Sequence, residues 1–107
     1  MNVEIKMINV VTTVNIKENE KSKFLEKFKE VLPKVKQEHG CIEYFAAIDI
    51  DSKIPIQELN EKVIIVLEKW ADMKSLHNHL TTPHIQTFLK EVKNIVENVS
   101  IKVLKEI

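Results

Sequence analysis

Glycine and arginine are almost missing from this 107-residue chain. Its one glycine, Gly40, cannot build a phosphate-binding loop or a dinucleotide-binding turn, because both need several positions without a Cβ. All sixteen cationic residues are lysines, and sixteen acidic residues balance them to a net charge of zero. Nucleic-acid binding needs a basic surface and favours the arginine fork, so the composition argues against it. A lysine offers a substrate phosphate or carboxylate only a point charge.

Cysteine and long apolar runs are also scarce. The single cysteine, Cys41, permits no disulfide within the chain. Met1–Lys6 lacks the apolar core of a signal peptide, and no run approaches the about 18 apolar residues of a membrane span. We therefore expect a soluble, cytoplasmic protein with one domain over residues 1–107, of which residues 1–6 form an N-terminal extension.

Hydrophobic periodicity predicts four strands, at residues 7–16, 41–50, 61–70 and 99–104. An apolar stripe from Phe24 to Val35 predicts the first helix. Pro33 lies inside this helix and should kink it or split off its last turn, and Gly40 is placed to end it as a left-handed cap.

The second helical region is predicted in two parts. Asp72 can cap a short helix that runs through Leu80. Thr82 and Pro83 form an N-cap and N1 pair that begins another helix, whose stripe extends to Val96. The resulting order is β-α-β-β-α-β, which is the ferredoxin-like α+β arrangement with an antiparallel sheet.

The third predicted strand is apolar on both faces. Val63, Ile65 and Leu67 share one face, and Ile64 and Val66 share the other. Helices can cover only one face of such a sheet, so a second copy of this short chain is the expected cover of the other face. The sequence therefore predicts a homodimer.

The polar and aromatic residues that could carry chemistry cluster in the second half of the chain. Glu68 and Trp70 alternate onto the Ile64 face of the third strand, and Tyr44 lies on a neighbouring strand. A buried carboxylate at Glu68 needs a partner or a cavity mouth, so it is either functional or part of a structural pair. An apolar cleft between sheet and helices, with a few polar groups near Trp70, suits a flat apolar ligand. Trp70 and Tyr44 could equally be plain core.

Histidines are the candidate bases. His84 lies near the N-terminus of the last helix, where the helix dipole favours the neutral imidazole, and His79 is the second candidate. Either could instead be a capping or exposed residue. His77 and His79 lie about 200° apart on a helix and cannot share an ion, so no metal site is expected.

Two motifs resemble the antibiotic biosynthesis monooxygenase family. The more specific is E-x-W followed by H-L-x-T-P-H, within E-K-W-A-D-M-K-S-L-H-N-H-L-T-T-P-H-I-Q-T-F at Glu68–Phe88. The other is E-H-G-C-I-E-Y at Glu38–Tyr44, which is similar to the family's E-x-G-C-x-x-Y. The match covers Met7 to Ile107, and within the family it most resembles the quinol monooxygenase branch that acts on menadiol-type hydroquinones.

This resemblance implies a dimeric α/β barrel that uses no flavin, haem or metal. Such enzymes oxidise electron-rich phenols or hydroquinones directly with O2, in a dry pocket that holds a base and a flat aromatic wall. On this hypothesis Trp70 and Tyr44 form the walls with Phe88 behind them, and Val66 contacts the substrate. His79 or His84 is the base, and Glu68 orients it.

Some positions depart from related branches. Polyketide-oxidising members carry an asparagine where this chain has Val66 and a tyrosine where it has Leu76, and the region around Leu89 offers no axial histidine for haem. Isomerases of a phosphorylated autoinducer share the fold and a similar segment at His79–His84. That isomerase activity and a non-catalytic module for small ligands are the alternatives to an oxygenase.

Overall fold

The structure is a computed structural model that describes residues 7–107. The predicted extension at residues 1–6 lies outside the described residues. Seven elements follow in the order β-α-β-β-α-α-β. The strands are β1 (Ile8–Ile16), β2 (Cys41–Ala47), β3 (Val63–Trp70) and β4 (Val96–Leu104), and the helices are α1 (Lys21–Lys36), α2 (Met73–Leu80) and α3 (Pro83–Val92).

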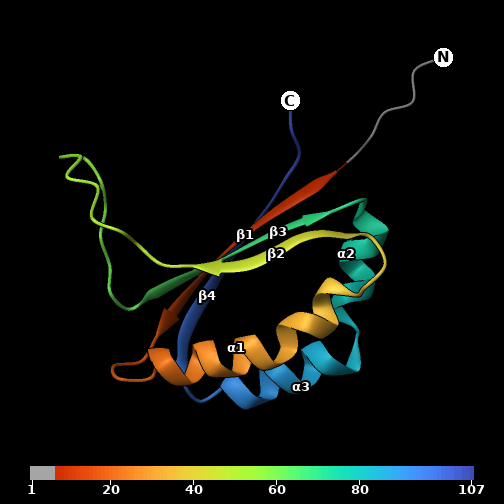
Figure 1. The fold of residues 1–107 in the computed structure, drawn as a ribbon, viewed down its shortest axis with the longest axis horizontal. Coiled ribbons are helices and arrows are strands. Elements are labelled where there is room, and N and C mark those ends of the chain that lie inside the picture. The colour runs from red at the N-terminus through yellow and green to blue at the C-terminus, as the bar shows by residue number, and fades with distance from the viewer. Residues whose placement is uncertain (1–6) are drawn as a thin grey trace.

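The four strands form one antiparallel sheet in the order β2-β3-β1-β4, and the helices of the described chain lie on one side of it (Figure 1). This is the ferredoxin-like arrangement that the sequence predicts. The register pairs Tyr44 with Glu68, and Glu68 with Val10. Residues of the candidate site on β2 and β3 are therefore cross-strand neighbours on the helix-covered face.

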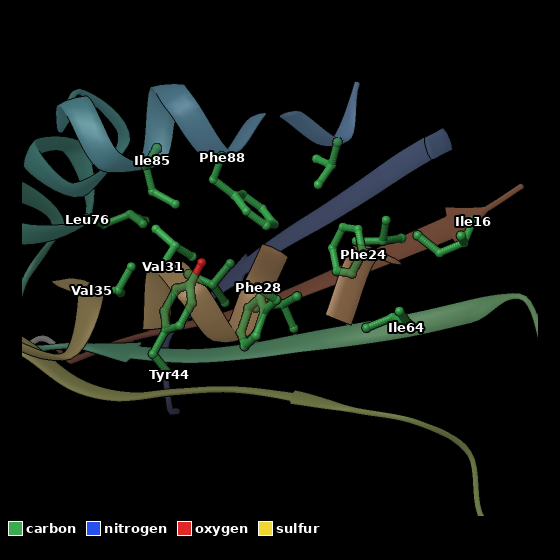
Figure 2. Close-up of a cluster of buried hydrophobic side chains, with 14 of the residues drawn as sticks. Ile16, Phe24, Phe28, Val31, Val35, Tyr44, Ile64, Leu76, Ile85 and Phe88 are labelled. Carbon is green, nitrogen blue, oxygen red and sulfur yellow. The ribbon is translucent and has the colours of Figure 1, made fainter. Parts of the chain in front are cut away.

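The core lies between this face and the helices (Figure 2). From the sheet, Val10, Ile64 and Trp70 are each at most 1% exposed. From α1, Phe24 and Phe28 project into the space between the helix and the sheet, as the apolar stripe predicts. Val10 and Ile64 alternate along their strands with outward-facing residues, as the period of a pleated strand requires.

Both helix caps foreseen for the second helical region are confirmed. Asp72 Oδ1 accepts a hydrogen bond from the Ser75 amide at 2.8 Å, and Thr82 Oγ1 accepts one from the Ile85 amide at 3.4 Å, with Pro83 at N1. These caps satisfy amides that have no partner inside the helix. Within residues 7–107, none of the helices is long and apolar enough to span a membrane.

Several sequence-based boundaries are corrected. Helix α1 is continuous through Pro33 to Lys36, so the proline does not split off a last turn. Gly40 has the expected positive φ, 84°, but it lies in the turn before β2 rather than at the helix end. Helix α3 stops at Val92, and β4 begins at Val96, three residues earlier than predicted. Strands β2 and β3 are each shorter than predicted at the ends joined by residues 48–62.

The opposite face of the sheet is also apolar. A row of neighbours crosses it at Phe45, Leu67 and Val11, and Phe45 is 44% exposed. The segment 48–62, which we call the β2–β3 arm, projects beyond the end of the sheet (Figure 1). Both features are surfaces that helices α1–α3 do not cover.

Candidate functional site

A cavity of about 200 Å³ lies between the sheet and helices α1 and α3. Its lining is almost entirely apolar, and the polar side chains in it are Thr12, Tyr44, Glu68 and His79. The apolar lining residues are Val14, Phe24, Phe28, Val66, Leu80, Ile85, Phe88, Leu89, Val92, Val96, Val99 and Ile101. Such a cavity accommodates a flat apolar molecule and offers it few hydrogen-bonding groups.

Aromatic rings form one wall of this cavity. Phe28 stacks on Tyr44 with ring centroids 5.5 Å apart and an interplanar angle of 8°. Phe88 meets Phe28 edge-on at 6.2 Å, and Phe24 meets Phe88 edge-on at 5.6 Å. These offset and edge-to-face geometries are the favoured ones for aromatic pairs. Tyr44, Phe88 and Val66, each predicted to contact a substrate, all line the cavity.

Trp70 lies behind the cavity and does not line it. Its side chain is fully buried, and its ring centroid lies 4.7 Å from that of His79. Its indole Nε1 donates a hydrogen bond of 2.9 Å to Glu68 Oε1. Trp70 therefore supports His79 and Glu68 from the core side. Its position is that of a core residue and not of the cavity wall that the family resemblance implied.

The predicted bases meet on one carboxylate, and it is not Glu68. His79 Nδ1 lies 2.9 Å from Glu38 Oε2, and His84 Nε2 lies 2.7 Å from the same oxygen. The side chains become more exposed along the series, from 3% at His79 to 10% at Glu38 and 19% at His84. An ionised carboxylate only accepts hydrogen bonds, so both imidazoles donate to it.

Local structure explains why these three side chains converge. Helices α2 and α3 meet at a tight corner, where Thr82 Oγ1 donates to the His79 carbonyl at 2.9 Å. This corner brings His79, at the end of α2, close to His84, at the start of α3. Glu38 reaches them from the α1–β2 turn. Gly40 holds that turn with its positive φ, and its carbonyl accepts from the Ala71 amide at 2.8 Å.

The contact with Glu38 determines which nitrogen of His79 is available. Because Nδ1–H donates to the carboxylate, the neutral imidazole carries its lone pair on Nε2. Among the described residues, the hydrogen bonds of His79's ring use Nδ1 alone. His79 lines the cavity, and with Nδ1 engaged by Glu38, Nε2 is the ring nitrogen left to interact with a bound molecule. His84 lines a separate surface groove between α1 and α3 instead.

Glu68 lies on the predicted face of β3, but its hydrogen-bond partner is Trp70 and not the histidine that it was expected to orient. It lines the cavity and is held by Trp70. Burial raises the pKa of its carboxyl above the usual value, although the Trp70 hydrogen bond and the nearby His79 oppose this. Burial also raises the pKa of the Tyr44 hydroxyl, and Glu68 adds to the effect, so Tyr44 stays protonated at neutral pH.

Sequence reasoning missed Glu38, Phe24 and Phe28 as site residues. Glu38 was visible only as part of the E-H-G-C motif, 41 residues from His79. The phenylalanines belong to the stripe of α1, where spacing cannot distinguish a cavity wall from core. His77 is exposed, as its position relative to His79 predicts. Within residues 7–107, no cluster of three His, Cys, Asp or Glu has the geometry to hold a metal ion.

Comparisons with known proteins identify relatives of this sequence and of this fold. "Probable quinol monooxygenase YgiN" of Escherichia coli K12 is 26% identical over 101 residues, covering 92% of this chain and 97% of that protein. A conserved protein from Methanosarcina mazei Go1 superposes with a TM-score of 0.84 at 20% identity, covering 96% of this chain and 95% of that one. A Caulobacter crescentus CB15 protein has a TM-score of 0.82 at 25% identity, covering 96% and 92%.

The family comparison spans most of the chain. The model of the antibiotic biosynthesis monooxygenase family matches residues 7–91, which contain the whole cluster of Glu38, His79 and His84. The chain therefore belongs to the antibiotic biosynthesis monooxygenase family.

Proposed function

We propose that this protein oxidises hydroquinones or related electron-rich phenols with O2, without an added cofactor. The observation that carries the proposal is a buried histidine, oriented by a carboxylate, in the wall of an apolar aromatic cavity. The 26% identity to a protein described as a quinol monooxygenase supports the same class of substrate.

His79 is the proposed base. A hydroquinone ring between the aromatic wall and the sheet can bring a hydroxyl to Nε2, and the neighbouring Glu38 stabilises the imidazolium that forms. Loss of the proton makes the hydroquinone a stronger one-electron reductant. Thr12, Tyr44 and Glu68 are the other polar side chains of the lining, and each can hydrogen-bond a second substrate oxygen.

The electrons pass from the deprotonated ring to O2. Transfer of two electrons and two protons gives the quinone and H2O2. Alternatively, one oxygen atom enters the ring and the other leaves as water, giving a hydroxyquinone. An apolar cavity helps to keep the radical pair together in both cases.

The cavity disfavours the phosphorylated substrate of the alternative isomerase. Its described lining contains no lysine, and Glu68 carries a carboxyl into it. Glu38 places a second carboxyl directly behind His79. A phosphate would lose its hydration there and gain no cationic partner.

Oxygen consumption tests the proposal. Purified, metal-free protein is mixed with menadiol, and the rate is corrected for autoxidation; H2O2 and hydroxyquinone are measured to separate the two outcomes. We expect an increase over background that His79→Ala abolishes and that His77→Ala, an exposed histidine on the same helix, leaves intact. No increase with the wild-type protein would refute the proposal.

We also propose that the uncovered face of the sheet forms a homodimer. The apolar row of Phe45, Leu67 and Val11 is the surface that supports it. We expect the wild-type protein to elute as a dimer in size-exclusion chromatography and Phe45→Glu to shift toward the monomer. Lys29→Glu, at an exposed position of α1, is the control. A wild-type protein that elutes as a monomer at micromolar concentration would contradict the dimer.

A further inference from the structure

The cavity is open on the side of β4. Four of its lining residues are about half exposed: Leu80 at 45%, Leu89 at 49%, Val99 at 57% and Ile101 at 54%. Val99 and Ile101 lie on the helix side of the sheet, since they pair with Val14 and Thr12. This apolar rim, which we call the mouth, would let water reach a reaction that needs a dry site.

The β2–β3 arm is a second exposed apolar surface, separate from the outer face of the sheet. Ile50 is 81% exposed, Ile54 57%, Ile56 92% and Leu59 54%. Isolated exposed aliphatic residues need no explanation, but four within ten residues of one loop indicate a contact surface.

The arm has its own hydrogen bonds, so its shape is defined before any contact. Gln57 Nε2 donates to the Ile50 carbonyl at 2.8 Å, and Gln57 Oε1 accepts from the Ser52 amide at 3.0 Å. Asp49 Oδ2 accepts from the Asn60 amide at 2.7 Å across the base of the arm. These bonds order the polar groups and leave the isoleucines outward. A preorganised surface loses less conformational entropy when it binds.

The arm does not reach the cavity mouth of its own chain in the observed structure. It joins β2 to β3, and β2 and β4 are opposite edges of the sheet. Figure 1 shows the arm projecting beyond the end of the sheet, away from the helices that frame the cavity. A twofold axis, however, lets two identical chains exchange such surfaces, each arm reaching the mouth of the other chain.

The exposed apolar area suits such an exchange. The aliphatic residues of one arm and one mouth expose on the order of 1,000 Å² together, and a twofold dimer contains this contact twice, comparable with the roughly 1,200–2,000 Å² of a stable interface. The outer face of the sheet would add to this area.

We propose that the β2–β3 arm of a second copy closes the cavity mouth at β4, so that each site is completed by two chains. Ile54 and Ile56 of the partner's arm would pack against Leu89, Val99 and Ile101. The proposal rests on the proposed function in one respect, namely that the enclosed cavity is the site of hydroquinone oxidation.

Cross-linking tests the contact independently of activity. In a Cys41→Ser background, Ile56→Cys and Ile101→Cys are combined and treated with a short bis-maleimide. We expect a dimer band on denaturing gels. The control combines Ile56→Cys with Lys29→Cys, on the exposed face of α1, and should give no such band. Absence of the band from the first pair, or a cross-link confined to single chains, would overturn the proposal.

Kinetics then test closure. We expect Ile54→Lys with Ile56→Lys to raise the KM for menadiol about tenfold, because two charged side chains cannot enter the apolar mouth. Glu18→Lys, exposed in the β1–α1 turn, is the control, and circular dichroism verifies the fold of each variant. An unchanged KM in the arm variant would overturn the proposal that the partner's arm closes the cavity mouth. A wild-type protein that cross-links yet consumes no oxygen would refute only the proposed function.

Discussion

Replacing Glu38 with glutamine isolates the contribution of the carboxylate shared by His79 and His84. One oxygen of Glu38 lies 2.9 Å from His79 Nδ1 and 2.7 Å from His84 Nε2. Glutamine has nearly the same shape but no charge, and its amide group donates where an imidazole also donates. The substitution therefore weakens the stabilisation of an imidazolium at His79 and keeps most of the packing.

The expected effect follows from the strength of a charged hydrogen bond. Such a bond contributes about 1.5–3 kcal/mol. If that stabilisation applies to the protonated His79 in the transition state, kcat falls about 10- to 150-fold. Glu38 does not line the cavity, so the KM for menadiol should stay within about twofold of the wild-type value. A loss confined to kcat identifies Glu38 as a positioning residue.

The assay is menadiol-dependent oxygen consumption at neutral pH, with the melting temperature measured for each variant. Glu26→Gln, an exposed acid on α1, controls for the loss of one negative charge. A Glu38→Gln kcat within about twofold of wild type would refute the reasoning. An equal loss of kcat in Glu26→Gln would refute it as well, because the effect would then come from net charge.

Three further outcomes follow from the site. Burial raises the pKa of Glu68 in the folded protein, so the contribution of its neutral carboxyl to stability is fully present below the pKa of the unfolded chain and is lost as pH rises through the folded pKa. In urea unfolding, the wild-type protein should therefore lose stability relative to Glu68→Gln from about pH 4 upward. Parallel stability curves for the two proteins would contradict this. Tyr44 stays protonated, so Tyr44→Phe should leave the pH profile of oxygen consumption unchanged, and a lost limb would contradict this. Gly40→Ala should cost at least about 1–2 kcal/mol in urea unfolding, because a left-handed alanine is strained and its Cβ would overlap the Ser75 side chain; a stability equal to wild type would contradict this.

Local patterns were sufficient for the elements and their order. Alternation along β3 placed Ile64, Val66 and Glu68 on one face, and the structure confirms it. Asp72 and the Thr82–Pro83 pair marked the helix starts because capping is a contact within one turn of the chain. Ends without such a cap were less well predicted. Helix α3 stops at Val92, although its apolar stripe continues to Val96, because Ile95 lies in the turn that follows and Val96 begins β4.

The sequence by itself determined the fold class, the sheet face that carries Tyr44 and Glu68, and the histidines worth testing, because these depend on periodicity and short-range motifs. Tertiary structure decided which groups meet. Glu38 lies 41 and 46 residues from the histidines that it holds, and only the packing of the α1–β2 turn against the α2–α3 corner brings them together. The same packing placed Trp70 behind the cavity. No spacing rule contains these contacts, because they depend on the angles at which whole elements pack.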